Sequence, residues 1–174
     1  MHSKQIPMTN DQFFTLLSKT HTKNIRIGIF ILLFGLITVI GAVAFGGADF
    51  GNFGKIFMLA LGGLCILLGI FMPLKAINAG KDLKAGKHPL AKAILENDKN
   101  YVLWFHEQVY TVENVKQTAA HQIWIYNRNN KADTISVKRN DTNDVMNFLA
   151  EKFPDALMGY SEEFKKKYNQ MVKK

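Results

Sequence analysis

Two long hydrophobic stretches dominate the pattern of this chain, residues 27–45 and residues 56–74. Each stretch runs for 19 residues without an ionised side chain. An α-helix rises by about 1.5 Å per residue, so each is long enough to cross the roughly 30 Å hydrocarbon core of a bilayer. Only residues 46–54 and Lys55 separate the two. The pattern therefore predicts a transmembrane helical hairpin over residues 25–77.

Small side chains recur every seven positions in both stretches. Seven residues make about two helical turns, so each set lies on one face of its helix. Membrane helices pack closely where such residues meet. In two antiparallel helices, the residue numbers of each facing pair add up to the same value. If that value is 104, the small residues of the first stretch face those of the second. We therefore predict a packed seam with three facing pairs, Gly28 with Ala76, Gly35 with Gly69, and Ala42 with Gly62.

The segments that flank the hairpin carry helical signals of their own. In the N-terminal segment, residues 1–24, Thr9 or Asn10 can cap a helix over residues 11–19. This helix either lies on the inner leaflet or extends the first span and packs on the polar domain. After the second span, residues 78–87 predict a basic juxtamembrane helix. Three lysines on one side of it either contact anionic lipid or only determine topology: Lys81, Lys84 and Lys87.

Residues 88–174 alternate between strand and helix patterns and predict a small α+β domain. Proline at position 89 suits the start of a helix over residues 90–96. Three segments rich in β-branched and aromatic residues predict an antiparallel three-stranded sheet, at 101–112, 119–126 and 132–138. A helix around Val145 then ends near Pro154, and Ser161 can cap a last helix in the C-terminal tail.

Alternation along the predicted strands separates two kinds of side chain. One face is aliphatic and should meet the helices, with Leu103, Phe105, Ile123, Ile125, Ile135 and Val137. The other face carries Val102, Trp104, Trp124 and Tyr126. An aromatic face of this size is either covered or used for binding. Either the helix at 90–96 or the C-terminal tail covers it, or Trp104, Trp124 and Tyr126 form an interaction surface.

The net charge of +8 is concentrated beside the hydrophobic stretches. Residues 1–26 and residues 75–87 each contribute a net +3, whereas residues 88–174 hold 13 basic and 11 acidic residues. Basic residues mark the cytoplasmic side of a membrane protein, so we expect both termini in the cytoplasm, and the inner membrane if the source is bacterial. A nucleic-acid partner would need a basic face on the polar domain, and we expect none.

Diagnostic catalytic and ligand motifs are absent from the sequence. Residues 106–110 read HEQVY, which begins like a zinc-peptidase motif but has Tyr110 in place of the second histidine. His121 suits a strand surface better than a site. Cys65 is the only cysteine, which excludes an intramolecular disulfide. Neither stretch carries an acid or a base away from its ends, as ion transport would require. We expect no enzyme activity, cofactor or metal.

A loose resemblance can be added on four short features: His88-Pro89, Trp104 in the first strand, Phe153-Pro154, and Gly159-Tyr160-Ser161. In these residues the chain resembles small uncharacterised bacterial membrane-hairpin proteins with a C-terminal short-sheet domain, distantly similar to PH-like domains. The resemblance implies a small sheet with a C-terminal helix, and no known activity.

These observations together predict a non-catalytic integral membrane protein that presents a small interaction or assembly domain at the inner leaflet. Its expected partners are membrane lipids and either a second copy or another protein. Two alternatives remain open at this stage. One is a peripheral lipid-sensing, PH-like module, and the other is an accessory subunit of a larger membrane enzyme or transporter.

Overall fold

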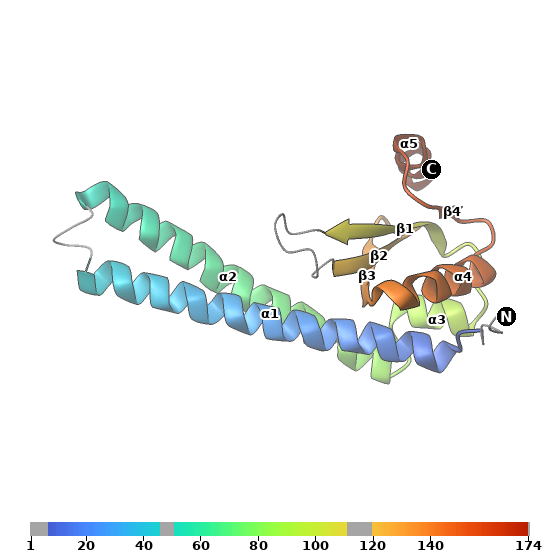
Figure 1. The fold of residues 1–174 in the computed structure, drawn as a ribbon, viewed down its shortest axis with the longest axis horizontal. Coiled ribbons are helices and arrows are strands. Elements are labelled where there is room, and N and C mark those ends of the chain that lie inside the picture. The colour runs from blue at the N-terminus through green and yellow to red at the C-terminus, as the bar shows by residue number, and fades with distance from the viewer. Residues whose placement is uncertain (1–6, 46–50, 111–119, 174) are drawn as a thin grey trace. The chain divides into compact units, whose positions relative to one another are not determined.

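The computed structural model describes residues 7–45, 51–110 and 120–173 (Figure 1). By its internal contacts the chain divides into a hairpin unit, residues 21–82, and a sheet unit, residues 1–20 together with 83–174. The elements in chain order are α1 (Asn10–Phe45), α2 (Gly51–Lys84), α3 (Pro89–Leu95), β1 (Val102–Tyr110), β2 (Ala120–Asn127), β3 (Ala132–Val137), the 3-10 turn η1 (Arg139–Asp141), α4 (Thr142–Lys152), β4 (Leu157–Met158) and α5 (Glu162–Val172).

The two long helices are apolar enough to cross a membrane, with windows of mean hydropathy 2.8 in α1 and 2.4 in α2. Helix α2 begins at Gly51, so residues 51–54 of the predicted loop are helical, and residues 46–50 lie outside the described residues. Pro73 does not end the helix, because α2 continues to Lys84. The expected pair of long apolar helices is therefore present.

Close contact within the hairpin unit occurs at the small residues. An ideal Cβ on Gly35 would lie 2.8 Å from the carbonyl oxygen of Gly62, and one on Gly69 would lie 2.5 Å from the backbone nitrogen of Leu32. Such distances leave no room for a side chain. The structure buries all six residues of the predicted seam: Gly28, Gly35, Ala42, Gly62, Gly69 and Ala76.

The predicted register of the seam is wrong by three residues. Gly69 faces Leu32 rather than Gly35, and Gly28 faces Pro73 rather than Ala76, so facing numbers sum to 101 instead of 104. A slide of three residues is close to one helical turn and keeps the same face in contact, so spacing alone cannot distinguish the two registers. In the observed register the missing side chain of Gly28 makes room for the Pro73 ring.

The sheet has four strands in the order β3-β2-β1-β4 and is mixed rather than purely antiparallel. The three predicted strands pair antiparallel as expected, with His106 of β1 opposite Trp124 of β2. The predicted strand ends at Thr111, Val112 and Ala119 lie outside the described residues. The unpredicted β4 pairs parallel with β1 and has only two residues, too few to show an alternating pattern.

The core lies between one face of this sheet and the helices α3, α4 and the start of α1. Phe105, Ile123, Ile125 and Ile135 are all buried in it, as the aliphatic pattern predicted. Leu103 and Val102 exchange the predicted faces: Val102 belongs to the core cluster and Leu103 does not. The cause is an irregularity in the β1–β2 register between Val102 and Trp104, which interrupts the alternation.

The first turns of α1 belong to the sheet unit. Phe13 and Leu17 are fully buried in its core, and the Phe13 ring stacks on Phe148 at 4.8 Å between centroids. The Thr20 hydroxyl accepts a hydrogen bond from the backbone N–H of Ser136 in β3. Of the two alternatives for residues 11–19, the structure contains the helix that extends the first stretch and packs on the polar domain. Within the described residues, α1 is thus continuous from Asn10 into the first hydrophobic stretch.

Candidate functional site

The aromatic side chains of β1 and β2 lie on the sheet face opposite the core. The Trp104 ring stacks on Tyr126 at 4.7 Å and lies 4.7 Å from the imidazole of His106. The Trp124 ring lies 6.1 Å from that of Tyr126 with nearly parallel ring planes, and Trp124 remains half-buried. Side-chain alternation along the strands predicted that Trp104, Trp124 and Tyr126 share one face. The same alternation places His106 on that face. The result is a continuous row of rings across two strands.

The C-terminal segment covers one part of this row. The indole N–H of Trp104 donates to the carbonyl oxygen of Gly159 at 2.7 Å, and Trp104 is only 3% exposed. Gly159 has φ +94°, a conformation that favours glycine, and it carries the chain from β4 toward α5. The Tyr168 ring of α5 then lies 5.3 Å from that of Tyr126. The C-terminal tail, not the helix at 90–96, is the partial cover, because α3 packs in the core on the other face.

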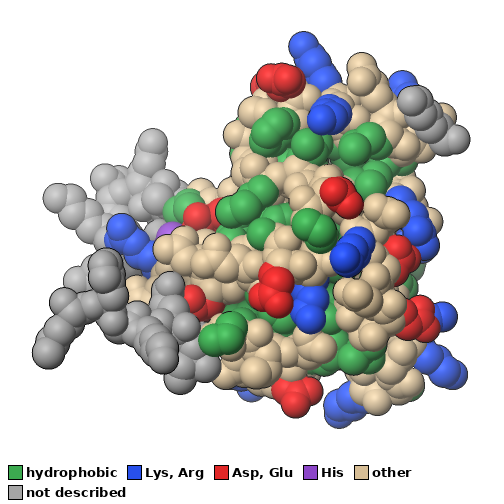
Figure 2. All heavy atoms as spheres, turned by 90° about the vertical axis from the view of Figure 1, so that its right-hand side faces the viewer, with side chains coloured by type: hydrophobic (Ala, Val, Ile, Leu, Met, Phe, Trp, Pro, Cys, Tyr) green, Lys and Arg blue, Asp and Glu red, His purple; other side chains and the backbone are tan. Residues whose placement is uncertain are grey.

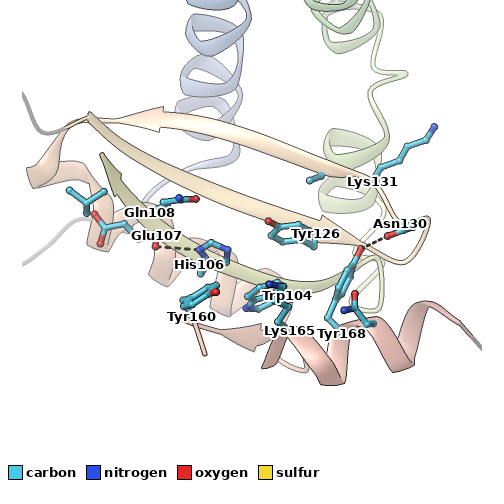
Figure 3. A pocket seen from close by; sticks show the side chains of 13 residues that line it. Trp104, His106, Glu107, Gln108, Tyr126, Asn130, Lys131, Tyr160, Lys165 and Tyr168 are labelled. Carbon is cyan, nitrogen blue, oxygen red and sulfur yellow. Dashed lines mark hydrogen bonds between the residues drawn. The ribbon is translucent and has the colours of Figure 1, made fainter. Parts of the chain in front are cut away.

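A groove of about 620 Å³ remains open between this segment and the sheet (Figure 3). Its walls are aromatic, and its polar lining comes from the turn between β2 and β3 and from α5. Trp124 is not among the lining residues, although its indole nitrogen is buried without a hydrogen-bond partner. The lining residues include Trp104, His106, Tyr126, Tyr160, Lys131 and Lys165.

Burial determines the protonation states of the histidine and the tyrosines in the groove. Desolvation lowers the pKa of the His106 imidazole, an effect partly opposed by its hydrogen bond with the Glu107 carbonyl oxygen at 3.3 Å. His106 is therefore neutral at pH 7, with Nδ1–H donating to that oxygen and Nε2 left as an acceptor. Desolvation also raises the pKa of Tyr126 and of Tyr168, so both phenols stay protonated. The groove thus offers uncharged rings with polar edges and two lysines.

His121 is not on the strand surface as predicted. It is buried on the core side, and its Nδ1 lies 2.5 Å from the Glu107 carboxylate, which the Thr142 hydroxyl also approaches at 3.5 Å. Glu107 is the only carboxylate that lines the groove among the described residues, and this contact engages it. No group of His, Cys, Asp and Glu suited to a metal ion exists in the described part of the chain.

The other predicted site residues lie elsewhere. The six small residues are in the hairpin unit, and Cys65 lies beside Gly35 there. Lys81, Lys84 and Lys87 are exposed and do not line the groove.

A protein-family model described as Domain of unknown function (DUF6709) matches residues 75–168, more than half of the chain. The chain belongs to this family. The DUF6709 match spans the end of α2, the whole sheet and most of α5, so it contains the aromatic row and its C-terminal cover. Comparisons with curated proteins and with solved structures found no match.

The sequence does not reveal the groove residues that come from the C-terminal segment, because they are distant in sequence from β1 and β2. Tyr160 and Tyr168 lie more than fifty residues beyond Trp104, and no local pattern connects them to it. Nothing in the local sequence distinguishes Lys131 and Lys165 from other lysines. His106 is the exception, because its two-residue spacing from Trp104 predicts that both side chains lie on one face of a strand.

Proposed function

We propose that this DUF6709 protein is an integral membrane protein that presents its sheet unit in the cytoplasm as a non-catalytic interaction or assembly module. The aromatic groove is the binding surface in this proposal. A homo-oligomer or a complex with another protein is the expected assembly.

Membrane insertion is supported by the poor burial of the apolar helices. Only 17% and 11% of the most hydropathic windows of α1 and α2 are buried, whereas the core helix of a soluble protein would be mostly buried. Large side chains along both helices are exposed, among them Phe30, Ile37, Phe57 and Phe71. Exposed apolar area on this scale is unfavourable in water and favourable in lipid.

The cytoplasmic placement rests on charge. Net positive charge flanks both hydrophobic stretches on the side that carries the two termini. Residues 88–174 hold 13 basic and 11 acidic residues and are therefore close to neutral. On the face seen in Figure 2, acidic and basic side chains are interspersed with hydrophobic ones. A mixed surface of this kind favours a protein or peptide partner over nucleic acid.

The observation that carries the binding role is the incomplete cover of the aromatic row. Trp124 and Tyr126 of the row remain half-buried, and Tyr160 of the covering segment is 58% exposed and lines the groove. Aromatic side chains with polar tips are favoured anchors in interfaces, because they bury a large area and still make a hydrogen bond.

Affinity purification of the tagged full-length protein in mild detergent tests this role. We expect a stoichiometric partner that Tyr160→Ala loses while the melting temperature of the protein stays unchanged. Leu95→Ala is the matched control, because Leu95 is 60% exposed and lies outside the groove. Retention of the partner by Tyr160→Ala would rule the groove out as the binding surface. Enrichment of anionic lipid that depends on Lys81, Lys84 and Lys87, with no protein partner, would favour lipid sensing instead.

A further inference from the structure

The edge of β1 beside the groove is open. β4 pairs with β1 only at Trp104 and Phe105, whereas β1 continues to Tyr110. Residues 106–110 therefore have a strand neighbour on the β2 side alone in the described part of the chain. An unpaired strand edge presents hydrogen-bonding groups that another extended chain can satisfy.

The hydrogen-bond pattern identifies which groups face outward. The carbonyl oxygen of Phe105 accepts from the N–H of Gly159, so residue 105 faces away from β2. Successive residues of a strand direct their backbone N–H and C=O groups alternately to one side of the strand and to the other. The β1–β2 register is regular from Trp104 to Tyr110, so this alternation continues without a break. Glu107 and Val109 consequently direct their N–H and C=O groups toward the open edge. The Glu107 carbonyl oxygen also accepts from His106 Nδ1 at 3.3 Å, whereas the two N–H groups and the Val109 carbonyl oxygen face the edge.

The open edge and the groove form one surface. Glu107, Gln108 and Val109 line the same groove as Tyr160 and Trp104 (Figure 3). Val109 is also exposed. A chain paired with this edge would therefore place alternate side chains against the aromatic wall.

The free charge of the groove is positive. The Glu107 carboxylate is engaged by His121, and Lys165 makes only an exposed contact with Glu162 at 3.8 Å. Lys131 is exposed at the β2–β3 turn, at the end of the groove level with Trp104 rather than with residues 106–110, so it would meet the end of a bound segment. An acidic side chain on the incoming segment would be complementary to these lysines.

We propose that the groove takes an extended acidic peptide segment of a partner protein, which adds as a strand to the open edge of β1 and inserts an apolar or aromatic side chain beside Tyr160. This strand addition is an established mode of peptide recognition, in which main-chain hydrogen bonds give affinity and side-chain pockets give specificity. The proposal rests on the proposed function and names the chemistry of its partner.

Selection of a phage-displayed random-peptide library on the full-length protein in lipid nanodiscs tests the proposal. We expect enrichment of proline-poor peptides with an acidic and an aromatic residue. Val109→Pro removes an outward N–H without breaking a bond to β2, and should weaken a selected peptide by about tenfold or more. Val109→Thr, which keeps the N–H, should bind normally, and Lys131→Glu should weaken acidic peptides.

N-methylation of single amides along the selected peptide gives a readout that does not depend on protein folding. We expect binding to fall at alternate positions only, because alternate amides of an added strand face β1.

Failure to select any peptide, uniform tolerance of N-methylation, or normal binding by folded Val109→Pro would overturn the proposal. A nanodisc dimer that Val109→Pro dissociates would also overturn it, since a second copy would then occupy the edge. If Tyr160→Ala loses the native partner but Val109→Pro keeps it, the proposed function stands and the strand addition falls.

Discussion

Phe13 shows how much a single buried residue far from the sheet in sequence contributes to the sheet unit. Its ring is fully buried and stacks on Phe148 of α4, next to Leu17 from the following turn. Together with the side chains of α3 and α4, these two side chains form the cover of the core face of the sheet. A fragment that begins at His88 would lack them, so we expect it to be unstable by itself.

Phe13→Ala should therefore lower the free energy of unfolding of the sheet unit by about 3–5 kcal/mol, because it leaves a cavity in the core. Tryptophan fluorescence measures this unit selectively, since Trp104 and Trp124 are the only tryptophans of the chain. Thr15→Ala, at an exposed position of the same helix, should leave the unfolding curve almost unchanged. Equal effects of the two variants would mean that α1 does not contribute to this core.

His106 should make the stability of the sheet unit depend on pH. Its pKa in the folded state is lowered by burial below the ordinary value of 6.5, so the unfolded state takes up the proton first as the pH falls. The stabilisation from neutral His106 is thus present above pH 6.5 and is lost as the pH decreases below it. Urea unfolding monitored by fluorescence should give a smaller change between pH 7.5 and about pH 5 in His106→Gln than in the unmodified protein. Identical pH profiles would contradict this role.

Among the elements, α1 and α2 pack through glycines because no side chain fits between their backbones. The observed register places Leu32 against Gly69 and the Gly62 carbonyl oxygen against Gly35. Gly63 belongs to the same helix as Gly62, but a Cβ there would meet nothing within 4 Å. The contact is thus specific to one face of α2.

Gly35→Leu should separate the helices and destabilise the hairpin unit, whereas Gly63→Leu should be tolerated. Thermal denaturation of the detergent-purified variants, followed by helical circular dichroism, measures the difference. Comparable loss of helicity in both variants would show that close approach at Gly35 is not needed.

The register can be tested separately with pairs of cysteines in a Cys65→Ser background. Cysteines at positions 32 and 69 should form a disulfide on mild oxidation. An ideal Cβ at position 69 would lie 2.7 Å from the Cβ of Leu32, so a small separation of the helices brings the two to disulfide distance. Cysteines at positions 35 and 69, which face each other only in the predicted register, should crosslink poorly. The opposite result would support the predicted register, in which the numbers of facing residues add up to 104.

For the whole molecule, the proposed membrane topology predicts which positions an impermeant thiol reagent can reach. In intact cells that express the Cys65→Ser variant, a cysteine introduced at Asn52 should be labelled, because Asn52 lies in the first turn of α2, at the end of the hairpin that the proposal places outside. A cysteine at exposed Asn143, in the sheet unit that the proposal places in the cytoplasm, should be labelled only after the membrane is permeabilised. Labelling of Asn143→Cys in intact cells would contradict the cytoplasmic placement.

Properties that depend on residues near one another in sequence could be predicted. Hydropathy and length determined the two long apolar helices, since a helix is defined within its own turns. The Ser161 cap of α5 was also predictable, and its hydroxyl accepts from the N–H of Phe164 at 3.0 Å. Alternation likewise assigned Phe105 and Ile123 to the core and Trp104 and Tyr126 to the opposite face, because strand side chains alternate whatever the strand pairs with.

Contacts between residues distant in sequence were decided only by the tertiary structure. The pairing of β4 with β1, the burial of Phe13 beneath the sheet and the Trp104–Gly159 hydrogen bond all join segments more than fifty residues apart. No periodic pattern encodes such pairs, because many placements of a two-residue strand or a helix end satisfy the same local preferences. The three-residue slide of the hairpin has the same origin: two registers present the same faces, and the fit of the Pro73 ring against Gly28 distinguishes them. The open edge of β1 and its groove exist because β4 ends after two residues and the chain turns at Gly159 onto the aromatic face.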